Sequence, residues 1–413
     1  MKSNKDLYAQ VDEEGRLVLS PELVFRYGIK PGGCVRVHED TNGLHVCHPS
    51  RLAKLYIEPT NQCNLDCRHC IRNVWNEPMG KMSDAVFARI IEGLRNLSPL
   101  PAIFFGGFGE PLFHPEIVRM VAQAKAIGAP VELITNATLL TTGLSRELIR
   151  AGLDTLWVSL DGATPESYAD IRLGAALPRV LENLTHFRDA VRDESDLVDG
   201  CCCGFAPKTH LGIAFVAMKR NIADLPEVIH IGQGFGAERF LVTNVLPYTR
   251  EMIDEVLYDW ALNKKCDRHL SLPRMCVDEI TYAPIYQTIR NVYGTWAGIN
   301  SKSGRNRCPF IASGAGAVSW DGSLSPCLPL LHNHTSFLGY LQYDQRFSRR
   351  WAIGNVMERS LLDLWNTLEH VAFRQRVQAF EFSPCTTCGC CDMSEKNEED
   401  CFGNSFPTCG GCL

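Results

Sequence analysis

Apolar residues recur along most of this chain with two different periods. Short runs rich in Val, Ile, Leu and Phe alternate with longer segments in which apolar residues recur every three or four positions. The first pattern is typical of buried strands, and the second is typical of helices with one apolar face. We expect strands at 54–58, 102–105, 131–135, 155–160, 210–217 and 239–245. We expect helices at 83–97, 177–193 and 223–234, with further helical segments between 246 and 300.

Strands that alternate with helices predict a parallel sheet and therefore an α/β fold. Six such units predict a partial (β/α)6 barrel of the TIM type, whose open side would admit a large substrate. Barrels of this kind keep their active sites at the carboxyl ends of the strands. We assign residues 51–300 to this barrel.

The first 50 residues follow a different pattern and form a candidate separate module. Short apolar runs at 7–11, 16–19, 35–38 and 43–47 predict strands, and a capped segment at 20–28 predicts one short helix. This order resembles the AbrB/SpoVT-like swapped-hairpin module, which is known mostly from DNA-binding regulators. Residues 1–50 hold six Lys and Arg against seven Asp and Glu, whereas phosphate binding needs a basic surface. Two interpretations stay open: a docking edge for a peptide or protein, and a structural cap on the barrel.

Three cysteines follow the first barrel strand. Cys63, Cys67 and Cys70 are separated by three and then two residues, on a loop that begins where Pro59 breaks the strand. Three thiolates can hold three irons of a cubic [4Fe–4S] cluster and leave the fourth iron open for a ligand. The alternative is a zinc site or unligated thiols, but structural zinc sites close with four ligands.

The CxxxCxxC spacing after a first strand resembles the signature of the radical SAM superfamily. The resemblance implies that the amino and carboxylate groups of S-adenosylmethionine (SAM) chelate the open iron. It also implies that the reduced cluster cleaves SAM to a 5′-deoxyadenosyl radical. His69 departs from the pattern, because the residue before the third cysteine is usually aromatic in the superfamily.

The ends of the next strands carry the other motifs of this resemblance. Residues 106–111, Gly-Gly-Phe-Gly-Glu-Pro, resemble the superfamily's GGEP motif with one residue inserted, and glycines let a backbone approach a ligand closely. In the family this segment holds the methionine amino group, the Ser-Leu-Asp-Gly position at 159–162 binds the ribose, and an arginine pairs with the SAM carboxylate. An ordinary turn and a surface arginine are the alternatives. The SAM-binding residues expected here are Gly106, Gly107, Gly109, Glu110, Asn136, Ser159, Asp161 and Arg172.

A second cysteine system begins in the segment that we assign to 301–413. Cys308 and Cys327 flank a predicted hairpin turn at 320–322, and this spacing resembles the SPASM domain appended to many radical SAM enzymes. Eight tail cysteines suffice for two auxiliary four-cysteine clusters, and a pair of zinc ribbons is the alternative. This count of ligands does not use Cys390. The three adjacent cysteines at 201–203 are expected in a loop. The candidate ligands are Cys308, Cys327, Cys385, Cys388, Cys391, Cys401, Cys409 and Cys412.

Further segments narrow the resemblance to one subfamily of radical SAM enzymes. Residues 70–75, 77–80, 105–111, 400–404 and 407–412 resemble the radical SAM maturases associated with tungsten-cofactor oxidoreductases. The resemblance implies radical hydrogen abstraction from a peptide or protein, with ferredoxin or flavodoxin as an electron donor. The partner would be an aldehyde-oxidoreductase-like tungstoenzyme or a short peptide. Two alternatives remain: modification of a small molecule such as a metal–pterin cofactor, and an iron–sulfur electron carrier or redox regulator.

Charge and cysteine content add further limits. The 413 residues carry a net charge of −6, which argues against general binding to nucleic acid or to a membrane surface. The sequence shows neither an apolar run long enough to span a membrane nor the apolar core of a secretion signal. Nineteen cysteines in such a chain favour metal ligation over disulfides. We therefore expect an enzyme of the reducing cytoplasm.

Overall fold

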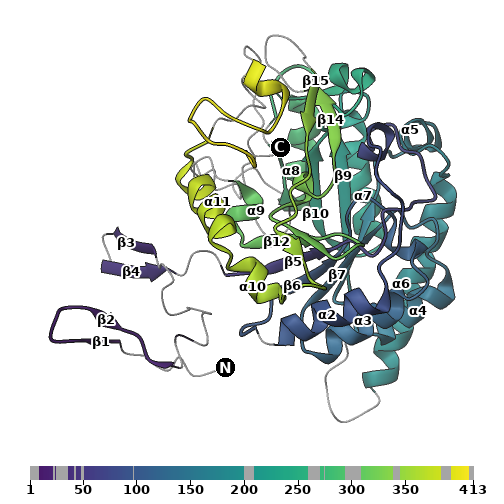
Figure 1. Cartoon of the computed structure of the whole chain (residues 1–413). Helices are drawn as coiled ribbons and strands as arrows, with labels where there is room; N and C mark the ends of the chain where they lie inside the picture. The colour runs from purple at the N-terminus through teal and green to yellow at the C-terminus, as the bar shows by residue number, and fades with distance from the viewer. Residues whose placement is uncertain are drawn as a thin grey trace.

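A ten-stranded sheet forms the centre of this computed structural model (Figure 1). Six of its strands are parallel neighbours in chain order, which confirms the α/β fold with a mostly parallel sheet. They are β5 Lys54–Ile57, β6 Ala102–Phe105, β7 Val131–Thr135, β8 Thr155–Ser159, β9 His210–Ala217 and β10 Ala237–Asn244. The structure describes residues 9–21, 24, 36–40, 43–47, 51–95, 97–199, 209–258, 270–273, 275–293, 308–337, 345–382 and 392–408.

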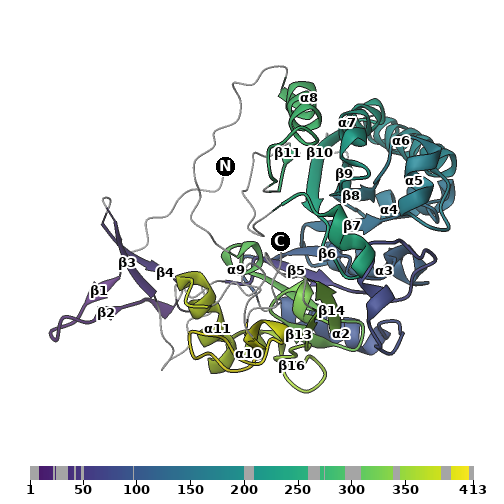
Figure 2. The ribbon, with the colours of Figure 1, turned by 90° about the horizontal axis from the view of Figure 1, so that it is seen from above.

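Helices follow these strands and cover one side of the sheet. Seen from above, the strands form an arc with the helices along its outer side (Figure 2). The predicted helix at 177–193 continues to residue 199. The helices are α2 Asp84–Arg95, α3 Ile117–Ala126, α4 Thr142–Arg150, α5 Pro165–Ile171, α6 Leu177–Asp199 and α7 Leu225–Gly234.

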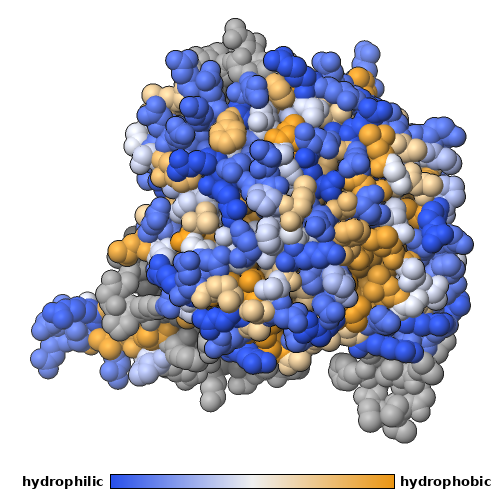
Figure 3. Space-filling model, turned by 45° about the vertical axis from the view of Figure 1, so that its right-hand side comes forward, coloured by the Kyte–Doolittle hydropathy of each residue, from blue (hydrophilic) through white to orange (hydrophobic). Residues whose placement is uncertain are grey.

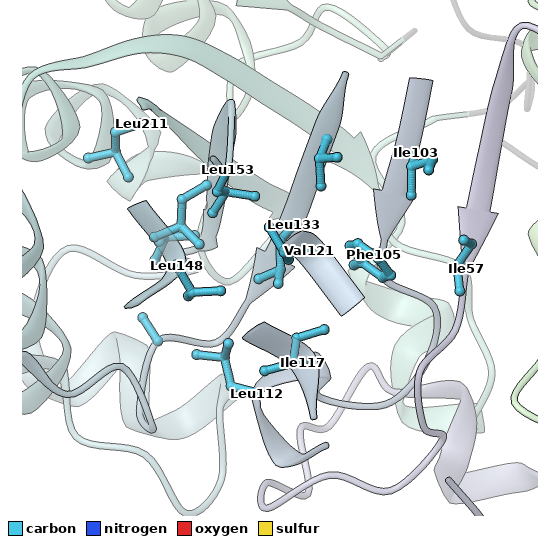
Figure 4. Close-up of a cluster of buried hydrophobic side chains, with 14 of the residues drawn as sticks. Ile57, Ile103, Phe105, Leu112, Ile117, Val121, Leu133, Leu148, Leu153 and Leu211 are labelled. Carbon is cyan, nitrogen blue, oxygen red and sulfur yellow. The ribbon is translucent and has the colours of Figure 1, made fainter. Parts of the chain in front are cut away.

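The two faces of the strands have different surroundings. Side chains such as Ile57, Phe105 and Leu133 point toward the helices and meet Ile117 and Val121 of α3 (Figure 4). On β7 and β8 the residues between these core positions are only half-buried. Because neighbouring side chains of a strand point to opposite faces, the half-buried residues line the concave side of the arc.

The C-terminal segment extends the same sheet beyond β5. Strand β12, Ala315–Val318, runs parallel to β5, with Ala315 opposite Lys54 and Val318 opposite Ile57. Strands β13, Ser323–Ser325, and β16, Gly354–Asn355, then pair in antiparallel order. The segments on either side of residue 300 therefore share one sheet.

Part of the C-terminal segment packs around a second apolar cluster. Its buried members include Leu330, Trp351 and Phe373. Helix α10, Leu361–Trp365, also packs against α2, where a Cβ on Gly93 would lie 2.9 Å from the Leu361 Cβ. The other elements are α9 Pro309–Ala312, η6 Leu328–Leu330, β14 His334–Phe337, β15 Gln345–Ser348, α11 Leu368–Ala379 and η7 Asp392–Glu395.

The segment predicted as helical between 246 and 300 is only partly helical where it is described. It contains η4 Arg250–Glu255 and α8 Tyr282–Tyr293, but also β11 Leu270–Ser271, which is parallel to β10. The prediction missed this strand because two residues are too few to show a period.

The described N-terminal residues form two β-hairpins. Strand β1, Gln10–Val11, pairs with β2, Leu17–Val18, and β3, Arg36–Asp40, pairs with β4, Gly43–Cys47. All four strands overlap the predicted ones. The predicted helix at 20–28 and the cysteines at 201–203 lie wholly or mostly outside the described residues.

The described helices include none that is long and apolar enough to cross a membrane. The face in Figure 3 is mainly hydrophilic, with a group of apolar residues to the right of its centre. This mixed surface agrees with a composition of 41 basic and 47 acidic residues.

Two Leu→Ala substitutions test whether β5 anchors the core. Leu55 is fully buried on β5, whereas Leu368 is 86% exposed at the start of α11. Leu55→Ala should lower the free energy of unfolding by about 2–5 kcal/mol, because it leaves a cavity in a packed core. Leu368→Ala should change it by no more than about 0.5 kcal/mol. Anaerobic denaturant titration measures both, and equal effects would contradict the packing described.

Candidate active site

The loop after β5 carries the three cysteines of the first motif. Its backbone is held by another segment, because the Asp66 and Arg68 amides donate hydrogen bonds to the carbonyls of Leu173, just after α5, and Ile171, the last residue of α5. Helix η1, Ile71–Val74, begins directly after Cys70. Cys67 is buried, Cys63 and Cys70 are half-buried, and none of the three forms a disulfide.

The three thiols lie close enough to influence one another. The pKa of Cys67 is raised to about 11, mainly by burial; Cys70 and Cys63 contribute to the rise, and Arg172 opposes it. Burial likewise raises the pKa of Cys63. A metal ion that binds Cys67 and Cys63 must therefore displace their protons. Among the described residues, no three His, Cys, Asp or Glu side chains form a group that could hold a single metal ion.

The glycine-rich loop after β6 packs directly on the cysteine loop. A Cβ on Gly109 would lie 2.1 Å from the Thr60 carbonyl oxygen, and the Glu110 amide donates to the Gln62 carbonyl at 2.8 Å. Gly107 has φ of +147°, a conformation that favours glycine, and a Cβ there would meet the Glu58 side chain. Glycine is therefore required at both positions for the two loops to touch.

Glu110 is buried and fully engaged by neighbouring groups. Its carboxylate accepts hydrogen bonds from the Leu112 amide, the Thr135 hydroxyl and the Asn136 amide, at 2.7–3.0 Å. Burial raises the pKa of Glu110, and these hydrogen bonds oppose the rise. Glu110 thus joins η2, Pro111–Phe113, to the end of β7.

Asn136 lies between the cysteine loop and β7. Its side-chain amide donates to the side-chain oxygen Oδ1 of Asn64 at 3.0 Å and lies 3.9 Å from the Cys63 sulfur. Ser159 ends β8 and is half-buried. Both polar residues therefore stand at the carboxyl ends of strands, as the sequence predicts.

Asp161 and Arg172 form a buried ion pair. Their closest atoms are 2.6 Å apart, and Asp161 also accepts a hydrogen bond from the Val216 amide. Burial opposes the charge of Arg172, but Asp161 and Cys67 raise its pKa above the ordinary value. Burial lowers the pKa of His69, which lies 3.8 Å from Asp161, to about 4, so its ring is neutral at neutral pH. The residues expected to bind the SAM ribose and carboxylate are thus partners of each other.

The structure adds two residues to the site that sequence reasoning did not assign. Glu58 is buried at the end of β5 and accepts a hydrogen bond from the Phe108 amide at 3.0 Å. His332, from the C-terminal segment, donates to Glu58 at 2.8 Å. Only Glu58 had a sequence signal, as an acidic residue at the end of an apolar strand.

The tail cysteines are only partly described. Cys327 is buried and Cys308 half-buried, both at the second apolar cluster, while Cys401 is exposed. Cys385, Cys388, Cys391, Cys409 and Cys412 lie outside the described residues. The grouping of the tail cysteines into clusters therefore stays a prediction.

Two family models match the chain. Residues 57–204 match the radical SAM superfamily, and residues 308–392 match the SPASM iron–sulfur cluster-binding domain. These matches cover the cysteine loop, the glycine-rich loop and the start of the tail system.

Similar proteins span most of the chain. It is 29% identical over 367 residues to the tungsten-containing aldehyde ferredoxin oxidoreductase cofactor-modifying protein of Pyrococcus furiosus, covering 87% of this chain and 94% of that protein. It is 27% identical over 210 residues to the PqqA peptide cyclase of Bradyrhizobium diazoefficiens, covering 51% of this chain and 48% of the cyclase.

A solved structure supports the fold. Streptococcus suis SuiB bound to S-adenosylmethionine superposes with a TM-score of 0.52 at 17% identity, covering 83% of this chain and 71% of SuiB. The cysteine loop, the matching domains and the shared fold together lead to one assignment. The chain carries a radical SAM domain and a SPASM iron–sulfur cluster-binding domain, and these domains identify it as a radical enzyme that uses S-adenosylmethionine and iron–sulfur clusters.

Proposed function

We propose that this enzyme holds a [4Fe–4S] cluster on Cys63, Cys67 and Cys70 and uses it in the modification of a peptide or protein. The observation that carries the proposal is the set of three cysteines, none of them in a disulfide, on one loop at the carboxyl end of β5. When bound, the reduced cluster and SAM supply a 5′-deoxyadenosyl radical.

The chain's own groups give the expected SAM site its shape and charge. The backbone at Gly106, Gly107 and Gly109 offers close approach to the methionine amino group, since side chains there would collide with neighbouring atoms. Arg172 keeps positive charge beside Cys67, which suits a thiolate-bound cluster and the SAM carboxylate.

Several other residues expected near SAM hold the surrounding strand ends and side chains in place. Glu110 and Asn136 fix the ends of β6 and β7 against each other through the hydrogen bonds described above. Asp161 orients Arg172, and Ser159 ends the neighbouring strand. We therefore assign Ser159 and the backbone near residue 161 to the ribose side of SAM, with Asp161 acting through Arg172.

The substrate class follows from the open arc and from similar proteins. We expect the concave side of a partial barrel to admit a long substrate, and half-buried side chains of β7 alternate with the core positions there. The PqqA peptide cyclase is named for a peptide, and the mycofactocin maturase of Mycobacterium tuberculosis is named for maturation; they are 27% and 28% identical to part of the chain. SuiB bound to its precursor peptide SuiA superposes with a TM-score of 0.51. We place the enzyme in the reducing cytoplasm, with ferredoxin or flavodoxin as the electron donor and a tungsten-dependent oxidoreductase or a short peptide as the partner.

A second candidate function is modification of a small molecule such as a metal–pterin cofactor. The Pyrococcus furiosus relative is named as cofactor-modifying. A 150-residue stretch is also 33% identical to the 7,8-dihydro-6-hydroxymethylpterin dimethyltransferase of Methanocaldococcus jannaschii. These names favour a pterin-type substrate as the alternative.

Alanine substitution tests the radical cluster. Replacing Cys63, Cys67 and Cys70 together should abolish release of 5′-deoxyadenosine from SAM by the reduced protein, because the cluster loses its ligands. Anaerobic turnover with product chromatography measures the release. Turnover at the wild-type rate in the triple variant would refute the assignment.

Metal content tests the tail. The reconstituted enzyme should hold on the order of twelve irons, four in each of three clusters. The triple alanine variant should keep roughly eight, with the tail still loaded. Iron and zinc analysis of protein purified without oxygen decides the question, and stoichiometric zinc would favour the zinc-ribbon alternative.

Deletion of residues 1–50 tests the docking role of the N-terminal hairpins. Uncoupled SAM cleavage should stay largely intact, because the cysteine loop and its described neighbours lie outside this segment. Affinity for a peptide or protein partner should fall, since hairpin strands offer edges to an extended chain. Pull-down from native extract with both proteins measures the difference. Recovery of the same partners by both would favour a structural cap instead.

A further inference from the structure

The inserted residue of the glycine-rich loop lies in an environment made by two domains. Phe108 is the residue that separates Gly107 from Gly109, and its amide donates to Glu58 at 3.0 Å. Its ring packs edge-on against Trp75 and His332, with centroids 5.8 and 5.9 Å away. Trp75 follows the cysteine loop, and His332 belongs to the SPASM region. The insertion therefore gives the loop a backbone and a ring contact at the domain junction.

Glu58 connects the two sides of this junction. One carboxylate oxygen accepts the hydrogen bond from Phe108, and the other accepts one from His332 Nε2 at 2.8 Å. Both Glu58 and His332 are 1% exposed. A hydrogen bond between such groups is worth more than one at the surface, and loss of the His332 donor would leave one buried oxygen of Glu58 without the partner described for it.

The position of His332 is set by neighbours other than Glu58. Its Nδ1 lies 3.9 Å from Glu77, and the adjacent Asn333 amide donates to Glu77 at 2.8 Å. The Asn333 side chain in turn accepts a hydrogen bond from the Arg350 amide at 2.8 Å. These contacts hold His332 against the SPASM region and the segment after η1. Through its hydrogen bond to Glu58, His332 therefore connects the SPASM region to the glycine-rich loop.

We infer that Glu58 and His332 are positioning residues through which the auxiliary-cluster domain sets the SAM-binding conformation of the loop at 106–110. This inference rests on the proposed function, which assigns that loop to SAM. Correct docking of the SPASM region would then tighten SAM binding, and a displaced region would weaken it.

Substitutions in the full-length, reconstituted enzyme test this coupling. His332→Phe keeps a ring against Trp75 and Phe108 but removes the donor, and it should raise the KM for SAM about tenfold while changing kcat less. More SAM should also be needed to produce its change in the electron paramagnetic resonance spectrum of the reduced cluster. His332→Gln, which retains a donor, should recover most of the affinity.

His334→Phe is the matched control. His334 is buried in the same segment, and its ring packs on Tyr248. The hydrogen bond described for its ring nitrogens goes to the His332 carbonyl and not to Glu58. Its KM for SAM should stay within about twofold of wild type. An equal rise in KM for both Phe variants would show general damage to the segment and overturn the inference.

A double-mutant cycle separates coupling from local damage. Glu58→Gln removes the buried charge, so His332→Phe should cost less in that background than in the wild-type enzyme. Independent effects of the two changes would refute coupling, as would a wild-type KM in His332→Phe. If His332→Phe loses iron from the tail, its KM no longer reports on the hydrogen bond alone. The KM of Glu58→Gln for SAM then tests the inference, because Glu58 lies in the radical SAM core, and an unchanged KM in that variant would refute it. Failure of the wild-type enzyme itself to cleave SAM would instead contradict the proposed function.

Discussion

The site depends on one close contact between two loops. The Gly109 backbone lies against the Thr60 carbonyl with no space for a side chain, and the Glu110 amide donates to the next loop carbonyl at Gln62. The Glu110 carboxylate then accepts a hydrogen bond from the Asn136 amide, which connects the two loops to the end of β7. A shift of either loop would therefore change the position of the cysteines relative to the ends of β5, β6 and β7.

Burial of like charges is the second constraint on this arrangement. Cys67 lies near Asp161 and is strongly disfavoured as a thiolate, with a pKa of about 11. Arg172 favours the thiolate of Cys67 and so offsets part of this effect. A cation that binds here must displace the protons of Cys67 and Cys63, since burial raises the pKa of both thiols.

The sequence predicted what depends on neighbouring residues along the chain. Strand and helix periods placed β5 to β10 within a few residues, and motif spacing placed Cys63, Cys67 and Cys70 on one loop. It did not reveal what depends on distant packing. His332 reaches Glu58 from 274 positions away, and no local pattern marks such a pair. The pairing of Asp161 with Arg172 was also missed, because each residue was considered separately as a contact to SAM.

The parallel pairing of β12 with β5 has a consequence for how this enzyme is made. One edge of β5 is completed by Ala315–Val318, which a ribosome produces long after the cysteine loop has emerged. Until then that edge exposes unpaired backbone groups, which are prone to pair with other chains. Contacts of such long separation also form slowly. The nascent radical SAM core is thus an incomplete sheet whose last strands arrive together with the SPASM region, so a chain truncated before residue 315 would lack part of its core as well as its tail.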